Sequence, residues 1–247
     1  MPLPLQFFFA SMTIYFIMKL KVLLTGATGM VGEGVLHKYL QHNQVEKVLV
    51  INRSPCDVNH SKPDEIIHDD FLDTSAIAEK MAGYTTCFFC HGVLSVRMKE
   101  ADYHRLTHTL TLSFAETLVK KKPAMIFCYI SGRGTDSTEK GRLMWARVKG
   151  KTENDLMKLP FKNAYAFRPG YMHPTKGLKS TLKAYKYVGW LYPFFRNFFP
   201  KSVSILKELG IAMILVGLKG YSRNIVEVKD IVSLATENIG LNSNRIK

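Results

Sequence analysis

Short apolar runs alternate along this chain with longer segments in which apolar residues recur every three or four positions. The apolar runs lie at residues 20–24, 45–51, 65–68, 86–90, 124–130 and 164–167. The segments with helical spacing lie at residues 31–40, 74–81, 100–122 and 141–159. Continuous apolar runs are typical of parallel strands that are buried on both faces. Their alternation with helices predicts an α/β fold, a doubly wound parallel sheet, over residues 18–170.

The pattern changes in the last third of the chain. Residues 185–199 concentrate aromatic side chains between lysines and arginines, and residues 205–218 form one largely apolar helix candidate. We expect residues 171–247 to form a small, mainly helical cap that packs on the same domain. An amphipathic face that docks on a membrane or covers a partner is the alternative, with residues 185–218 as its location.

Residues 1–17 precede the first predicted strand and are mostly apolar. A secretory signal would begin with positive charge, yet the first basic residue is Lys19. The apolar stretch is short for a membrane span and is interrupted by polar residues. Met18 opens the first strand directly, so we expect residues 1–17 to be an extension outside the fold, with a hydrophobic anchor as the alternative.

The composition is that of a globular protein with an excess of basic residues. The 247 residues include 34 Lys and Arg against 20 Asp and Glu, which gives a net charge of +14. This charge suits phosphorylated ligands and anionic membranes, but no nucleic-acid-binding motif accompanies it, so we predict no nucleic-acid partner. The four cysteines do not form a disulfide framework for a chain of this size and indicate a reducing compartment, for which we predict the cytoplasm.

Cys87, Cys90 and His91 spell the C-x-x-C-H pattern of covalent haem attachment. The two cysteines lie in an apolar run of strand composition, where neighbouring side chains point to opposite faces. We therefore interpret them as buried structural cysteines, and we predict no metal ion.

Gly26, Gly29 and Gly32 directly follow the first strand. In a dinucleotide-binding turn the first glycine permits a tight turn, the second lets backbone N–H groups approach a pyrophosphate, and the third lets the helix pack closely on the strand. The anion then lies at the helix N-terminus, where unpaired N–H groups and the helix dipole favour it. A glycine-rich turn that binds nothing is the alternative, and the other strand ends decide between the two.

The second strand ends in Asn52, Arg53 and Ser54. A site for NAD would place a carboxylate here for the ribose 2′-hydroxyl, and that carboxylate would repel a 2′-phosphate. Arginine with neighbouring amide and hydroxyl groups instead binds a phosphate through charge-assisted hydrogen bonds. These residues favour NADP over NAD, and the alternative is a surface arginine at a strand end.

Distinctive polar residues also follow the third to sixth predicted strands. In chain order they are Asp69 and Asp70, His91, Ser131, and Arg168. A doubly wound sheet binds its ligand at the carboxyl ends of its strands, which is where all of these residues fall. The coincidence favours the dinucleotide interpretation.

With these features the chain resembles the short-chain dehydrogenase/reductase superfamily, in its extended or atypical branch of NAD(P)-dependent epimerase/dehydratase-like Rossmann proteins. The resemblance covers residues 19–170. It rests on Thr25-Gly26-Ala27-Thr28-Gly29-Met30-Val31-Gly32, Asp70-Phe71, Tyr129-Ile130-Ser131, Lys149 and Arg168-Pro169-Gly170.

The resemblance implies roles for individual residues. Besides the glycines and residues 52–54, the cofactor would be contacted by Thr28, Met30, Val31, Asp70, Phe71, His91, Gly92 and Pro169. Of these, Asp70 and Phe71 would contact the adenine, and Pro169 would lie beside the nicotinamide. Ser131 would orient the substrate, and Lys149 would hydrogen-bond the nicotinamide ribose. The alternatives are a loop serine that satisfies backbone groups and a lysine on the surface of a basic helix.

One position departs from the family. These enzymes exchange a proton with the substrate through a tyrosine four residues before the lysine, but this chain has Trp145 there. Indole donates a hydrogen bond but is neither an acid nor a base near neutral pH. Tyr129, Tyr171 and His173 are candidates to replace the tyrosine.

We therefore expect an NADP-binding oxidoreductase or epimerase-like protein that transfers hydride to or from a small-molecule carbonyl or hydroxyl compound. A non-catalytic NADP(H)-binding sensor or interaction protein is the alternative, and Trp145 favours it. Peripheral membrane contact, through residues 1–18 or 185–218, and self-association stay open.

Overall fold

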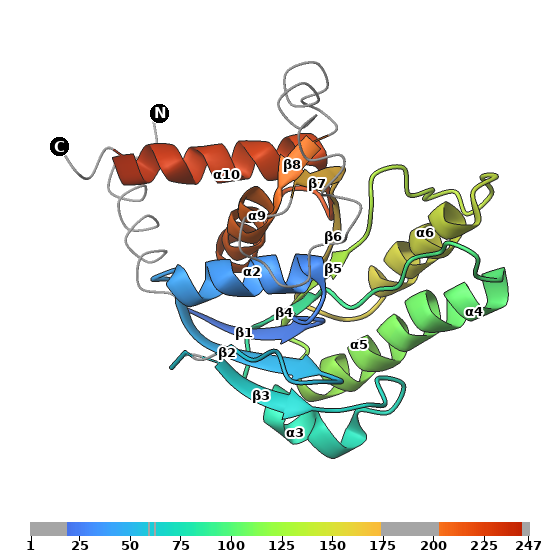
Figure 1. The fold of residues 1–247 in the computed structure, drawn as a ribbon, viewed down its shortest axis with the longest axis horizontal. Helices are drawn as coiled ribbons and strands as arrows, with labels where there is room; N and C mark the ends of the chain where they lie inside the picture. The colour runs from blue at the N-terminus through green and yellow to red at the C-terminus, as the bar shows by residue number, and fades with distance from the viewer. Residues whose placement is uncertain (1–18, 59, 62, 174–202, 244–247) are drawn as a thin grey trace, which may run out of the picture.

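A computed structural model describes residues 19–58, 60–61, 63–173 and 203–243 (Figure 1). Its main feature is one parallel sheet of seven strands in the order β3-β2-β1-β4-β5-β6-β9. The strands are β1 (Leu20–Thr25), β2 (Val45–Asn52), β3 (Pro63–Ile67), β4 (Thr86–Phe89), β5 (Ile126–Ile130), β6 (Asn163–Arg168) and β9 (Ile225–Glu227). The order reverses direction beside β1, so the predicted doubly wound sheet is confirmed.

Helices cover both faces of this sheet (Figure 1). One face carries α2 (Met30–Gln41), α9 (Leu206–Lys219) and α10 (Val228–Ser243). The other carries η1 (Ser75–Ile77), α3 (Ala78–Met81), α4 (Glu100–His104), η2 (Arg105–Thr109), α5 (Leu110–Lys121) and α6 (Met144–Leu156). Each face has its own apolar core, and the central strands are buried in both, as their continuous apolar sequences predict.

The segment predicted as a helix over residues 141–159 is shorter in the structure, where α6 begins at Met144. Residues 136–141 instead fold around Asp136. Its Oδ1 accepts hydrogen bonds from the backbone N–H and the hydroxyl of Thr138, and its Oδ2 accepts one from the N–H of Gly141. These local bonds compete with helical ones, which explains the later start.

The apolar helix candidate at residues 205–218 is a core element. It forms α9, which packs on α2, and Leu209, Ala212 and Met213 are fully buried. This part of the proposed membrane-docking segment therefore has no free apolar face, while residues 185–199 lie outside the described residues, as does the extension of residues 1–17. No helix in the described part of the chain is long and apolar enough to cross a membrane.

The region after β6 is joined to the main domain rather than separate from it. Its strand β9 pairs with β6 at the edge of the main sheet, with Phe167 opposite Val226. Two short strands, β7 (Tyr171–His173) and β8 (Val203–Ile205), pair in parallel beside it. The described C-terminal elements thus extend the same domain, and the two helices make them mainly helical.

Candidate functional site

The glycine turn lies between β1 and α2, and two of its three glycines, Gly26 and Gly32, have a steric reason. Gly26 has φ +71°, a backbone conformation that L side chains rarely adopt, and a Cβ there would lie 2.8 Å from the carbonyl carbon of Cys90. A Cβ on Gly32 would lie 2.1 Å from the carbonyl oxygen of Gly26. Gly29 precedes α2 and caps it with no side-chain hydrogen bond. No side chain thus caps α2, and its first N–H groups lie at a helix N-terminus of the kind that binds anions.

Asn52 braces this turn from the end of β2. Its side chain is buried, its Oδ1 accepts a hydrogen bond from the N–H of Ala27 at 2.9 Å, and its Nδ2 donates to Glu65 at 3.1 Å. Both groups of the amide are thus engaged within the protein. The next two residues, Arg53 and Ser54, are exposed beside the turn.

His91 and Phe71 meet beyond the ends of β4 and β3. Their rings stack with centroids 5.0 Å apart, and Phe71 is buried in the core. Burial, together with the charge of Arg53, lowers the pKa of His91 to about 4. The imidazole is therefore neutral near pH 7, and Arg53 supplies the positive charge here. Asp70 is exposed, and its Oδ1 accepts a hydrogen bond from the N–H of Leu72 at 2.8 Å.

Ser131 and Lys149 come together at the end of β5. The Ser131 hydroxyl is buried and lies 2.9 Å from the hydroxyl of Thr135. Lys149 on α6 donates to the carbonyl oxygen of Ile130 at 3.2 Å, and its Nζ lies 5.2 Å from the centroid of the Tyr129 ring. Burial lowers the pKa of Lys149 to about 8. The lysine is thus a half-buried group at the end of β5, next to the serine, rather than a fully exposed surface residue.

Trp145 lies one helical turn before Lys149 and packs on the loop after β5. A Cβ on Gly134 would lie 3.5 Å from its Cη2, and one on Gly132 would lie 3.9 Å from its Cζ3. The indole therefore covers the loop that follows Ser131, at the position where the family has its tyrosine.

Of the three candidates to replace that tyrosine, the structure describes the side chains of Tyr129 and Tyr171. The Tyr129 hydroxyl is buried and has no hydrogen-bond partner among the described residues, and burial raises its pKa well above the ordinary range. Burial also raises the pKa of Tyr171. Both phenols are thus poorer acids than an exposed tyrosine, and the side chain of His173 lies outside the described part.

The sequence reasoning missed a buried ionic cluster beneath Lys149. Arg168 pairs with Glu153 on α6 at 2.5 Å and with Glu227 on β9 at 3.3 Å, and it also hydrogen-bonds the hydroxyl of Ser137. Glu153 is fully buried and raises the pKa of Lys149 against the effect of burial. A sequence signal existed, because Glu153 follows Lys149 by one helical turn.

Next to Arg168, the buried Pro169 accepts a hydrogen bond from the N–H of Arg133 at 2.9 Å.

The cysteines do not form a haem site. Cys87 is buried within β4, Cys128 is buried within β5, and burial raises the pKa of both thiols. All four cysteines are free thiols. The prediction of buried structural cysteines is confirmed for Cys87, while Cys90 is half-buried beside the glycine turn.

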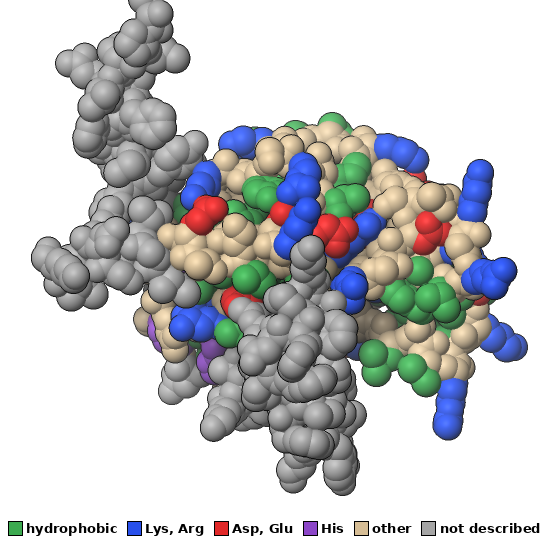
Figure 2. Space-filling view, turned by 90° about the horizontal axis from the view of Figure 1, so that it is seen from above, with side chains coloured by type: hydrophobic (Ala, Val, Ile, Leu, Met, Phe, Trp, Pro, Cys, Tyr) green, Lys and Arg blue, Asp and Glu red, His purple; other side chains and the backbone are tan. Residues whose placement is uncertain are grey.

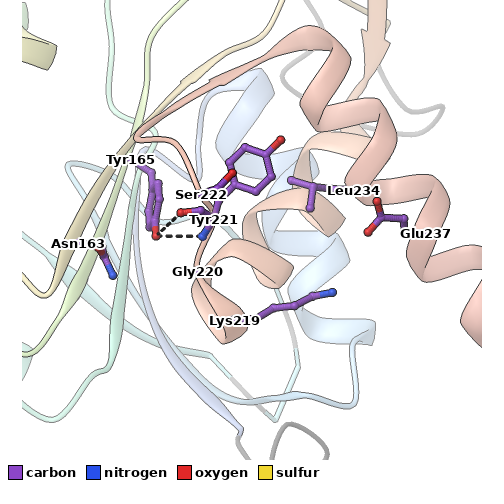
Figure 3. Close-up of a pocket in the computed structure, with 8 residues that line it drawn as sticks. All are labelled: Asn163, Tyr165, Lys219, Gly220, Tyr221, Ser222, Leu234 and Glu237. Carbon is purple, nitrogen blue, oxygen red and sulfur yellow. Dashed lines mark hydrogen bonds between the residues drawn. The ribbon is translucent and has the colours of Figure 1, made fainter. Parts of the chain in front are cut away.

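A cavity of about 480 Å³ lies at the end of the sheet opposite to the glycine turn (Figure 3). It opens at the start of β6 and the end of α9, where Asn163 and Lys219 line it, and Glu237 of α10 closes one side. Within it, the N–H of Tyr221 donates to the Tyr165 hydroxyl at 3.0 Å. This cavity belongs to the amino ends of the strands and is separate from the glycine turn.

Comparison with known families identifies residues 22–135 as an NAD dependent epimerase/dehydratase family domain. This match is consistent with the resemblance of the sequence to an atypical member of the short-chain dehydrogenase/reductase superfamily. The matched range ends just beyond Ser131 and so contains both the glycine turn and the loop after β5.

Solved structures of an NAD+-bound enzyme and of an epimerase share the fold. The Bordetella bronchiseptica enzyme WbmF, solved in complex with NAD+, aligns with a TM-score of 0.64 at 14% identity and covers 93% of this chain and 80% of its own. The Helicobacter pylori ADP-L-glycero-D-manno-heptose-6-epimerase aligns with a TM-score of 0.61 at 14% identity, covering 90% of this chain and 83% of its own. At this identity the likeness concerns the Rossmann fold alone.

Curated relatives are nearer in sequence. "Protein FMP52, mitochondrial" of Debaryomyces hansenii is 25% identical over 148 residues, which are 60% of this chain and 64% of the relative. "Protein fmp52-1, mitochondrial" of Aspergillus oryzae is 26% identical over 155 residues, 60% of this chain and 63% of the relative. The matches thus span slightly less than two thirds of these relatives.

Their names identify mitochondrial proteins, so the prediction of a cytoplasmic location is wrong. Free thiols fit any reducing compartment, which is why they did not distinguish the two.

Proposed function

We propose that this chain binds NADP(H) and acts as an NAD(P)-dependent oxidoreductase or epimerase-like protein on a small-molecule carbonyl or hydroxyl substrate. The observation that carries the proposal is the convergence of two groups at one edge of the sheet. The N-terminus of α2, which has no side-chain cap, follows β1, and buried Ser131 with half-buried Lys149 lies at the end of β5. Both lie at the carboxyl ends of parallel strands, where Rossmann folds bind dinucleotides.

In the proposed site, individual residues have separate roles. The N–H groups at the start of α2 would bind the pyrophosphate, and Lys149 would donate hydrogen bonds to the nicotinamide ribose. The Ser131 hydroxyl would orient a carbonyl oxygen. When bound, the cofactor supplies or accepts the hydride. Trp145 excludes water from the loop after β5 but exchanges no proton, so the proton relay is the part of the site that departs from the family.

The preference for NADP rests on Arg53. Its guanidinium is exposed at the end of β2, close enough to His91 to lower that residue's pKa. No described residue forms an ion pair or hydrogen bond with Arg53, so its charge is free for a 2′-phosphate. Asn52 contributes by fixing the turn, because its amide is already engaged.

Titration of NADPH and NADH by fluorescence tests the cofactor preference. We expect NADPH to bind more tightly, and Arg53→Gln to weaken NADPH binding about tenfold while NADH binding changes little, since a charge-assisted hydrogen bond contributes about 1.5 kcal/mol. Arg105→Gln, an exposed arginine of η2, is the matched control. Equal affinity of the wild type for the two cofactors would contradict the preference.

The second candidate is a non-catalytic NADP(H)-binding sensor, which Trp145 favours. Turnover separates the two functions. Oxidation of NADPH by any member of a panel of aldehydes, ketones and quinones would support the enzyme, whereas a tight NADPH complex with no turnover would support the sensor.

A mitochondrial location is proposed from the names of the curated relatives. Imaging of the tagged full chain against a mitochondrial marker tests it. Co-localisation is expected, and a uniform cytosolic signal would contradict it.

A further inference from the structure

Three of the four large hydrophobic side chains that are exposed in the described part of the chain lie in two loops. Leu94 and Val96, exposed by 66% and 71%, lie between β4 and α4, and Leu143, exposed by 59%, immediately precedes α6. We call these three residues the apolar rim. Exposed apolar side chains that gather on one surface are typical of an interaction site.

The two loops lie side by side. Glu100, the first residue of α4, pairs with Arg147 of α6 at 2.7 Å. Arg147 also donates to the carbonyl oxygens of Gly141 at 2.7 Å and Arg142 at 3.1 Å. One arginine thus fixes the loop of Leu143 against the start of α4, which directly follows the loop of Leu94 and Val96.

Both loops border the candidate site. They follow β4 and β5, as do His91 and Ser131, and therefore lie at the carboxyl edge of the sheet. Figure 2 shows hydrophobic side chains on the surface at the end of the molecule that carries α4 and α6, with basic side chains projecting around them. The apolar rim thus lies at the same edge of the sheet as the candidate site.

The charges around the rim are mostly positive. Five exposed basic residues lie in the same two loops, namely Arg97, Lys99, Arg133, Lys140 and Arg142. The nearby acidic groups are largely engaged: Glu100 pairs with Arg147, and Asp136 and Glu139 accept hydrogen bonds within their own loop and from Asn154. Asp102, one turn into α4, is the exposed exception. Exposed apolar side chains ringed by cations are the pattern of a surface that binds an anionic bilayer.

We propose that the apolar rim and its five basic neighbours dock this protein on an anionic phospholipid bilayer, with the carboxyl edge of the sheet, which carries the candidate site, facing the lipid. The three apolar side chains enter the boundary between headgroups and acyl chains, and the arginines and lysines contact lipid phosphates. A bilayer fits better than a second copy of the chain, because the basic ring would repel its own equivalent. The consequence is a substrate class: apolar carbonyl or hydroxyl compounds that dissolve in the membrane.

Vesicle co-sedimentation of the full chain tests this surface, using phosphatidylcholine vesicles with and without phosphatidylglycerol at low salt. We expect binding only to the anionic vesicles and a decrease at high salt. Leu94→Asn, Val96→Asn and Leu143→Asn combined should weaken binding at least about tenfold. Arg97→Glu with Arg142→Glu should weaken it about fivefold or more per charge.

Matched controls use exposed residues outside the rim. Ile67→Asn removes the fourth exposed hydrophobic side chain, and Lys120→Glu with Lys162→Glu reverses two exposed charges elsewhere, so both should bind like the wild type. Thermal unfolding and NADPH binding of each variant show whether the fold and the cofactor site are intact.

Three results would overturn the proposal. The wild type could fail to bind anionic vesicles at low salt. The rim variants could bind like the wild type, which would assign any membrane binding to another part of the chain. The rim variants could instead lower the mass of an oligomer in light scattering without changing vesicle binding, which would make the rim a contact between copies. None of these results depends on turnover, so the surface and the proposed function fail separately.

Discussion

The glycine turn and the end of β5 lie at the same edge of one parallel sheet, yet they constrain the protein differently. At the turn the backbone itself makes the site, and Gly26 and Gly32 admit no Cβ without displacing backbone atoms. At the end of β5 the candidate site consists of side chains, and Trp145 stands where the resemblance predicts a tyrosine. Cofactor binding through backbone N–H groups can therefore persist while the chemistry performed by side chains changes.

The largest expected effect tests the glycine turn. Gly32→Ala places a Cβ 2.1 Å from the carbonyl oxygen of Gly26, so α2 must move away from β1. We expect the free energy of unfolding to fall by at least about 4 kcal/mol, or the chain to fail to fold. Chemical denaturation measures this. Gly83→Ala is the control, since no atom lies within 4 Å of its added Cβ, and an equal loss there would refute the steric argument.

The ionic cluster of Arg168 and Glu153 tests how much side-chain contacts stabilise the region at the end of β5. Glu153→Gln leaves the buried guanidinium of Arg168 with a weaker partner, and we expect the free energy of unfolding to fall by about 3 kcal/mol. The pKa of Lys149 should also fall further, because Glu153 raises it. Glu46→Gln, which breaks the exposed pair with Lys21, should cost less than about 0.5 kcal/mol. Similar losses in the two variants would show that burial does not distinguish the pairs.

Trp145→Tyr tests whether the chemistry lacks only a hydroxyl. A tyrosine at this position lies on the same helical face as Lys149, one turn away, and can exchange a proton with a carbonyl substrate. We expect the rate of NADPH oxidation with a responsive aldehyde, ketone or quinone to rise about a hundredfold. Trp145→Phe fills similar space without a hydroxyl and should show no gain. A folded tyrosine variant that binds NADPH without faster turnover would contradict this account.

The smallest effect concerns His91. Its pKa is lowered from 6.5 to about 4 in the folded chain, so the unfolded chain binds a proton more readily between these values. Stability is then lost as the pH falls from about 6.5 to about 4, on the order of 2 kcal/mol given partial exposure. Denaturation across this range measures the slope. His91→Phe should flatten it, and an unchanged slope in that variant would assign the effect to other groups.

Much of the fold followed from local patterns. Buried parallel strands require continuous apolar runs, and the glycine spacing is tied to backbone geometry that few other sequences satisfy. Element ends were less well predicted, as at α6, where Asp136 forms local hydrogen bonds with Thr138 and Gly141 that no periodicity reveals. The family resemblance, which rested on these motifs, is confirmed.

By itself the sequence determined the parallel sheet, the glycine turn and the absence of a tyrosine four residues before Lys149. The tertiary structure decided which side chains meet. In the folded chain, α9 is buried against α2, and the side-chain amide of Asn52 forms hydrogen bonds within the protein. Lys149 lies next to Ser131, near the buried Arg168–Glu153 ion pair. The apolar rim stays exposed. The physical reason is the sequence separation over which each effect acts. Hydrophobic periodicity and the steric limits of glycine involve residues close together in the sequence. Burial and charge pairing involve segments that only the fold brings together.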